Sequence, residues 1–372
     1  MRKTVLSIHL FFSLMLGLFI VTTCTTGSLL LIEPEVERWM HPIGHKPSSG
    51  DVGILTIKQQ ADALSPDLKT DRIELPAQDG FYHVHIAKEG GKGGRLVYGD
   101  PGTGEVFGQV QEARMEPFAT IYDLHRYFLL TNMIGKAPAA SFVGFLGAGM
   151  MVILLTGIYM WWPGIKKWAL GFRIIRNRGK LAHHMSLHKT IGIVSIPVLL
   201  VITLTGVINA YEKSIPAWIG FKAKEEVPAS AMQSKSKDQP ILPVDKVAEL
   251  VHTKYPDSQL IKIQLPAKVG QTYQIGLRES FGASSASNST VYMDASSGEV
   301  IYKTNPNLAI NIYNTWRKGL HFATWGGETT KLIYFLFGMM PLVLMITGVA
   351  MWRLKARARK RQSKKNTAAA AA

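Results

Sequence analysis

The chain has 372 residues, with 42 Lys or Arg against 26 Asp or Glu and a formal charge of +16. The positive surplus is confined to residues 1–10, 163–190 and 353–372, which hold 2, 7 and 8 basic residues and no acidic residue. The rest of the chain carries 25 bases against 26 acids, so the charge does not describe a nucleic-acid-binding surface. With Cys24 as the only cysteine, disulfides are also excluded as a framework for the folded parts.

Four stretches of at least twenty residues lack Asp, Glu, Lys and Arg, and they cover 5–32, 139–162, 191–211 and 332–352. Each is long enough to cross the hydrocarbon core of a bilayer, about 30 Å thick, as a helix. We interpret the first as an uncleaved anchor, because its apolar run continues past Cys24 and exceeds the core of a secretory signal. The sequence therefore predicts four transmembrane helices.

The distribution of basic residues predicts the orientation, because positively charged loops remain in the cytoplasm. Residues 163–190 then form a basic cytoplasmic loop and residues 353–372 a basic cytoplasmic tail, with both termini cytoplasmic. Two soluble segments, 33–138 and 212–331, lie on the opposite side and include the approach to the following helix.

The sequence contains an internal duplication. In the first and third apolar stretches a histidine is followed eighteen residues later by the glycine of a Thr-Gly pair, as in His9 to Gly27 and His188 to Gly206. A histidine also precedes the second and fourth stretches, and both of those stretches end in a Thr-Gly-x-x-Met-Trp motif. The four repeated histidines are His9, His125, His188 and His321.

The outer segments repeat as well, since 73–76 (Ile-Glu-Leu-Pro) resembles 263–266 (Ile-Gln-Leu-Pro) and 97–106 resembles 291–300. Apolar residues at helical spacing in 243–255 and alternating residues near 273–277 and 290–293 predict a small α+β unit in each, with an antiparallel sheet.

These paired motifs resemble the PepSY-associated transmembrane family, whose iron-regulated inner-membrane proteins include ferrisiderophore reductases. The resemblance runs from His9 to Trp352. It implies a membrane α-helical fold with four transmembrane helices, two extracytoplasmic PepSY-like α+β domains and an internal duplication. It also implies b-type haem as the cofactor and the bacterial inner membrane as the location.

The predicted topology places the histidines at two depths, with His9 and His188 near the cytoplasmic face and His125 and His321 near the outer face. Two imidazoles at equal depth on facing helices can bind one haem iron, so two haems are expected. His183 and His184 compete with His188 for the inner site, and His188 is favoured because it alone matches His9 in the repeat.

Basic side chains near both pairs have two possible roles, as partners of haem propionates or as anchors at the membrane interface. They are Lys3 and Lys189 inside, and Arg126, Arg317 and Lys318 outside. His83 and His85 share one face of a predicted strand, which we expect to be a solvated sheet face rather than a metal site.

The resemblance therefore predicts a haem-dependent oxidoreductase that reduces a ferric siderophore, or another periplasmic ferric chelate, and releases ferrous iron. No flavin or nicotinamide motif is visible, so the electron donor is an unknown cytoplasmic protein or a quinol. The alternative is a non-redox PepSY module, anchored in the membrane, that binds or regulates a partner.

Overall fold

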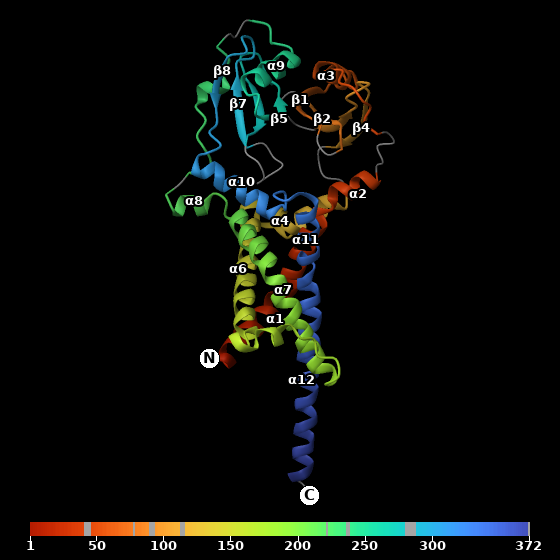
Figure 1. Ribbon diagram of the computed structural model, residues 1–372, viewed down its shortest axis with the longest axis vertical. Coiled ribbons are helices and arrows are strands. Elements are labelled where there is room, and N and C mark those ends of the chain that lie inside the picture. The colour runs from red at the N-terminus through yellow and green to blue at the C-terminus, as the bar shows by residue number, and fades with distance from the viewer. Residues whose placement is uncertain are drawn as a thin grey trace. The chain divides into compact units, whose positions relative to one another are not determined.

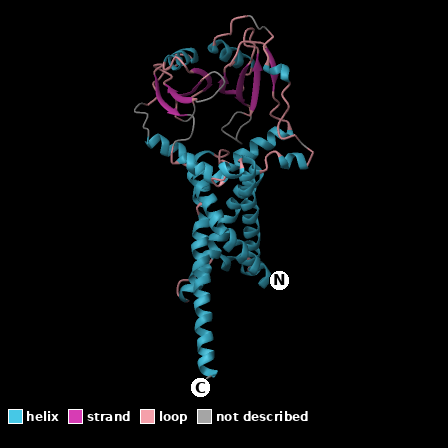
Figure 2. Cartoon of the chain, turned by 180° about the vertical axis from the view of Figure 1, so that it is seen from behind, coloured by secondary structure: helices cyan, strands magenta, loops and turns pink. Residues whose placement is uncertain are grey.

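The computed structural model describes residues 1–40, 46–76, 79–88, 94–111, 116–220, 222–235, 239–279 and 288–370. The chain divides into two compact units. The helical unit comprises Met1–Glu33, Thr120–Ile215 and Leu320–Ala372, and the sheet unit comprises Pro34–Ala119 and Pro216–Gly319. Among the described residues, all strands belong to the sheet unit (Figure 2).

Long apolar helices build the helical unit (Figure 1). They are α1 (Arg2–Leu31), α6 (Lys136–Trp161), α7 (Gly179–Ala210) and the consecutive pair α11 (Gly327–Gly338) and α12 (Met340–Ala370). Four spans within the described chain are long and apolar enough to cross a membrane, which confirms the predicted fold class.

The last span differs from the predicted helix 332–352 in two ways. It begins earlier, at Gly327, and it is interrupted at Met339, between α11 and α12. Pro341 accounts for the interruption, because it has no N–H to donate to the carbonyl four residues before it. Beyond Trp352 the helix does not end but continues through the basic tail to Ala370.

Small residues on α6 allow its neighbours to approach closely. A Cβ added at Gly147 would lie 2.7 Å from Val207 on α7, and one added at Gly149 would overlap Leu16 on α1. In a membrane, where helix association depends on contact between helices, such glycines are common at interfaces.

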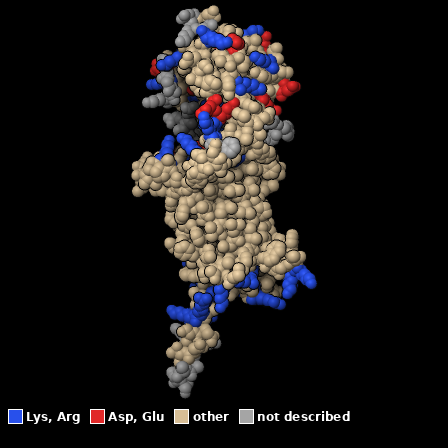
Figure 3. Space-filling model, turned by 90° about the vertical axis from the view of Figure 1, so that its left-hand side faces the viewer, with Lys and Arg blue, Asp and Glu red and all other residues tan. Residues whose placement is uncertain are grey.

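Basic side chains gather at one end of the helical unit and on the exposed part of α12, where Figure 3 shows Lys and Arg without Asp or Glu on the visible face. The Arg2 guanidinium donates to the carbonyl of Met160 at 3.3 Å, which joins the start of α1 to the end of α6. Trp161 Nε1 donates to the carbonyl of Gly171 at 3.0 Å and so holds the 3-10 helix η1 (Ile165–Phe172) against α6. We call this end of the helical unit the basic end.

Shorter helices complete the chain. They are α2 (Glu33–Met40), α4 (Phe118–Tyr127), α5 (Thr131–Ile134), α8 (Ser214–Trp218), η2 (Ala229–Met232) and α10 (Ala309–His321). Two of them, α4 and α10, carry the histidines that precede the second and fourth apolar stretches.

The sheet unit contains two four-stranded antiparallel repeats joined into one sheet of order β4-β3-β2-β1-β5-β6-β7-β8. The first repeat supplies β1 (Lys69–Glu74), β2 (Tyr82–Ala87), β3 (Arg95–Gly99) and β4 (Val106–Gln111). The second supplies β5 (Gln259–Gln264), β6 (Tyr273–Arg278), β7 (Ser289–Met293) and β8 (Val300–Lys303). The two α+β repeats predicted from the sequence are thus present, and their strands join in one continuous sheet.

The join lies between the Leu-Pro repeats themselves, where β1 pairs with β5 and Ile73 lies opposite Ile263. Both isoleucines are fully buried beneath α3 (Ile54–Ala63) and α9 (Val244–Lys254), which contribute Ile57 and Val247 to the same core. The alternating pattern of each strand thus covers one face of the sheet with apolar side chains.

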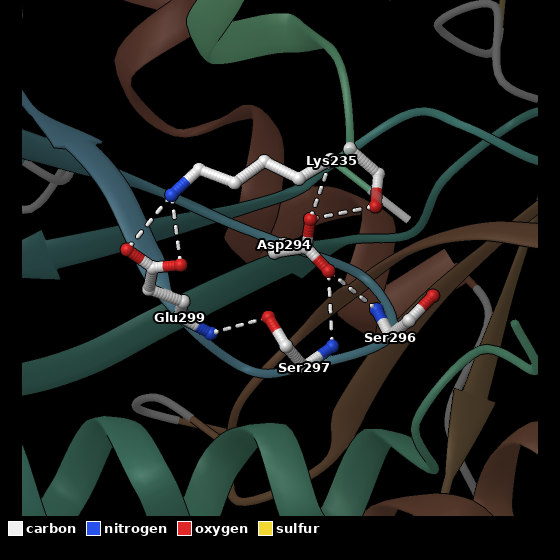
Figure 4. Close-up of polar contacts among 6 residues, drawn as sticks. Lys235, Asp294, Ser296, Ser297 and Glu299 are labelled. Carbon is white, nitrogen blue, oxygen red and sulfur yellow. Dashed lines mark hydrogen bonds and ion pairs between the residues drawn. The ribbon is translucent and has the colours of Figure 1, made fainter. Parts of the chain in front are cut away.

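A buried aspartate closes the turn after the third strand of each repeat. Asp294 Oδ1 accepts hydrogen bonds from the backbone N–H groups of Ser296 and Ser297, and Oδ2 accepts from Lys235 N and Ser234 Oγ (Figure 4). Burial favours the neutral acid, but these four donors outweigh it and hold the pKa of Asp294 far below its ordinary value. Asp100 repeats the arrangement in the first half.

We expect Asp294→Asn to loosen the β7–β8 turn and to cost about 2 kcal/mol or more, because an amide NH2 would face the Lys235 N–H donor. Since the folded pKa is lowered, the stabilisation is present above the ordinary Asp value of about 3.9 and is lost as the pH falls through the folded value. Hydrogen exchange of β7 and β8 in the full-length protein measures both effects. Asp257→Asn, an exposed control, should leave exchange unchanged; equal protection in both variants would contradict the role of Asp294.

Candidate functional site

The four repeated histidines lie on four different helices and gather at two levels of the helical unit. At the basic end are His9 on α1 and His188 on α7. At the other level are His125 on α4 and His321 on α10. Because His125 packs on Gly27, eighteen residues beyond His9 on α1, the two levels are about 27 Å apart along that helix.

The two histidine rings of the outer pair lie next to each other. The ring centroids of His125 and His321 are 6.3 Å apart and their planes are inclined by 30°. Two nitrogens bound on opposite sides of one metal at about 2 Å each, with roughly 1 Å from each nitrogen to its ring centre, give a centroid distance of about 6 Å. The outer pair therefore has the spacing of two axial imidazoles.

At the basic end, His9 and His188 lie within electrostatic range of each other. Both histidines of the predicted inner pair thus lie at the basic end, one on α1 and one on α7.

A Thr hydroxyl from another helix holds three of the four imidazoles through Nδ1. His9 Nδ1 lies 2.9 Å from Thr156 Oγ1 on α6, and His188 Nδ1 lies 2.9 Å from Thr347 Oγ1 on α12. His321 Nδ1 lies 3.1 Å from Thr205 Oγ1 on α7.

The direction of these bonds follows from the other contact of each hydroxyl. Thr156 donates to the carbonyl of Val152 at 2.7 Å, Thr205 to that of Val201 at 2.7 Å and Thr347 to that of Val343 at 3.0 Å. A hydroxyl carries one hydrogen, so its oxygen accepts the bond from the imidazole N–H. Each of these histidines is therefore the Nδ1–H tautomer, with the lone pair on Nε2.

His125 reaches the same state through a different partner. Its Nδ1 lies 2.9 Å from the carbonyl oxygen of Thr23 on α1, and a carbonyl can only accept. All four imidazoles thus hold Nδ1–H in a hydrogen bond, so Nε2 is the ring nitrogen that carries the lone pair, as in metal-bound histidines whose other nitrogen donates to an outer partner.

The glycine of each Thr-Gly pair provides the surface against which the ring lies. A Cβ added there would lie 3.7 Å from His9 at Gly157, 3.7 Å from His188 at Gly348 and 3.2 Å from His321 at Gly206. At Gly27 it would lie only 2.7 Å from Cε1 of His125. We call each Thr-Gly pair, with the residues that complete the hydrogen bond, a histidine seat.

Sequence reasoning missed the histidine seats, because it treated Thr-Gly as a mark of duplication without assigning it a contact. For Gly27 and Gly206 the signal was present in the eighteen-residue spacing that the two share. That spacing carries each of these glycines to the far end of the helix from His9 or His188.

The competing histidines at the basic end are placed differently. His183 Nδ1 donates to the carbonyl of Ile175 at 3.0 Å and so fastens the preceding loop to α7. His184 Nδ1 is buried and has no hydrogen-bond partner among the described residues. Only His188 has a histidine seat, which supports its choice over both neighbours.

Contacts are described for three of the five predicted basic partners. Arg126 donates to the carbonyl of Asn209 at 3.2 Å, and Arg317, 7% exposed, donates to Asn314 Oδ1 at 3.1 Å. Lys189 lies within electrostatic range of Arg2 and Lys355. No contact described for Lys3 or Lys318 separates an anchoring role from a propionate-binding one.

His83 and His85 do not converge on a shared ligand position. His83 Nε2 lies 2.6 Å from Asp79 Oδ2, and His85 lies 2.8 Å from the guanidinium of Arg72. Within the described part of the chain, no group of three or more His, Cys, Asp or Glu side chains is arranged to hold a metal ion.

A protein-family model matches most of the chain. The model of the PepSY-associated TM region covers residues 6–355, from the start of α1 into α12. No curated protein matches the chain significantly. Because the match includes both repeats and all four histidines, the chain belongs to the PepSY-associated transmembrane family.

Proposed function

We propose that the chain is a di-haem reductase of the bacterial inner membrane that passes electrons across the bilayer to a ferric siderophore or another periplasmic ferric chelate. The observation that carries the proposal is the state of the four histidines. They lie in pairs at two levels, and each ring is held in place through a hydrogen bond at Nδ1.

Each pair has a defined role in this proposal. His9 and His188 would bind an inner haem, and His125 and His321 an outer haem, with b-type haem supplying one-electron oxidation and reduction. The hydrogen bonds at Nδ1 fix the ring orientation and make Nε2 a stronger donor to iron. No acid, base or nucleophile is needed, because the chemistry is electron transfer alone.

Two ligand pairs suit a path across the membrane. A single site near one face would leave about 30 Å of hydrocarbon between it and a partner on the other side. The histidine seats along α1 and α7 divide this distance, because each of these helices has a ligand near one end and a seat for another ligand near the other.

The basic segments set the direction. Residues 163–190 and 353–372 carry Lys and Arg without acids, which supports a cytoplasmic location for this end and for both termini. His125 and His321 then lie near the periplasmic face. Ferric chelates hold iron through hard oxygen ligands, which bind ferrous iron less well, so reduction would release it. A cytoplasmic protein or a quinol would supply the electrons.

Purification from haem-replete cells in mild detergent tests the proposal. We expect a reducible Soret band, about two haems per chain by haemochromogen assay, and reoxidation of the reduced protein by a ferric hydroxamate with capture of ferrous iron by a chelator. A colourless protein would overturn the proposal and favour the non-redox PepSY module. Haem that is reduced but not reoxidised by any ferric chelate would overturn the choice of acceptor.

A further inference from the structure

His184, at the basic end, has a side chain whose role the histidine seats do not explain. Its Nδ1 is buried, with no hydrogen-bond partner among the described residues. A buried polar atom left without a partner costs about 1–3 kcal/mol, and such an atom in a folded protein calls for an explanation. The neighbouring His183 is already used, since it bonds to Ile175.

The position of His184 relates it to the inner pair. It precedes His188 by four residues on α7, which is about one helical turn, so both side chains lie on the same face of the helix. Counting from His9, the equivalent residue on α1 is Val5, which cannot form a hydrogen bond through its side chain. The first half of the chain thus has no counterpart of the His184 imidazole, which lies one helical turn before His188, toward the start of α7.

The charges around this level favour an anion. Lys189 on α7 lies within electrostatic range of Arg2 on α1 and Lys355 on α12. The segments 1–10, 163–190 and 353–372 contain no Asp or Glu that could balance them. Three helices thus bring positive charge together where the sequence supplies no carboxylate of its own.

We propose that His184 donates an N–H hydrogen bond to a propionate carboxylate of the haem held by His9 and His188, an inference that rests on the proposed function. A porphyrin bound between facing helices lies with its plane along them, so its edge reaches the residue one turn from the ligand. A carboxylate there gains the His184 N–H as a donor and the nearby cations as counter-charges.

His184→Ala in the full-length protein, with His184→Gln as the conservative variant, tests this contact. We expect His184→Ala to keep the six-coordinate, low-spin spectrum of both haems. The inner haem should transfer to apomyoglobin at least about tenfold faster and have a lower midpoint potential, because its propionate loses a donor. His184→Gln, whose amide N–H can still donate, should restore most of the retention.

The outer haem serves as the internal control, because its retained spectrum and release rate show that the variant is folded. Unchanged inner-haem release and potential in His184→Ala would overturn the inference and leave the proposed function standing. Loss of the low-spin signal at the inner site would also overturn it, because His184 would then be an axial ligand. A wild-type protein without haem would instead remove the proposed function itself.

Discussion

His188→Ala is expected to lower the haem content of the purified protein from about two per chain to about one. The remaining haem should keep the spectrum and potential of the outer pair, because His125 and His321 lie about 27 Å away along the helices. His321→Ala should have the reverse effect and leave the inner haem. Haemochromogen quantification with potentiometric titration of the Soret band distinguishes the two variants.

His183→Ala is the matched control for the inner site, since its ring bonds to the carbonyl of Ile175 and has no histidine seat. This variant should retain both haems. Loss of both haems from His188→Ala or from His321→Ala, in a protein that remains folded by circular dichroism and gel filtration, would leave the two-pair assignment without support.

Gly27→Ala is expected to disable the outer pair although it changes no ligand. The added methyl group would lie 2.7 Å from Cε1 of His125, whereas carbon atoms in contact prefer about 3.5–4.0 Å. The ring must therefore move by about 1 Å, and its hydrogen bond to the Thr23 carbonyl must break or stretch. We expect loss of most of the outer haem, or at least a change in its potential, with the inner haem unaffected.

Gly157→Ala provides the control, because it makes the same substitution in the equivalent motif. There the added Cβ would lie 3.7 Å from His9, an ordinary contact, so both haems should be retained. Equal haem content and potentials in Gly27→Ala and Gly157→Ala would show that His125 does not lie against Gly27 in the loaded protein.

The sequence was sufficient for the membrane spans and the histidine quartet. Residues such as those of 139–162 lack charge over a length that only a spanning helix explains, and duplication singled out four histidines from eleven. The alternation within 273–277 and 290–293 likewise predicts β6 and β7, and the helical spacing in 243–255 predicts α9.

Contacts between elements could not be predicted in the same way. Nothing in the Leu-Pro repeats indicates that 73–76 and 263–266 would pair with each other, because strand pairing depends on edges that meet only in three dimensions. The sequence also could not show which Thr-Gly pair His9 and His188 would contact, since each ring lies against a glycine more than a hundred residues away. Pro341 indicated a break in the helix near Met339. This break was not predicted from the sequence, because the apolar run continues without interruption on both sides.

The histidine seats have a consequence for how the chain arose. Each ring rests on a seat within its own half: His9 on Thr156 and His125 on Thr23 in the first, and the other two likewise in the second. Each pair nevertheless takes one member from each half. A half-length ancestor associating as a symmetric dimer could therefore have completed both pairs, each from two identical residues on a twofold axis. Gene fusion would then have freed the equivalent positions to diverge, as Val5 and His184 have done.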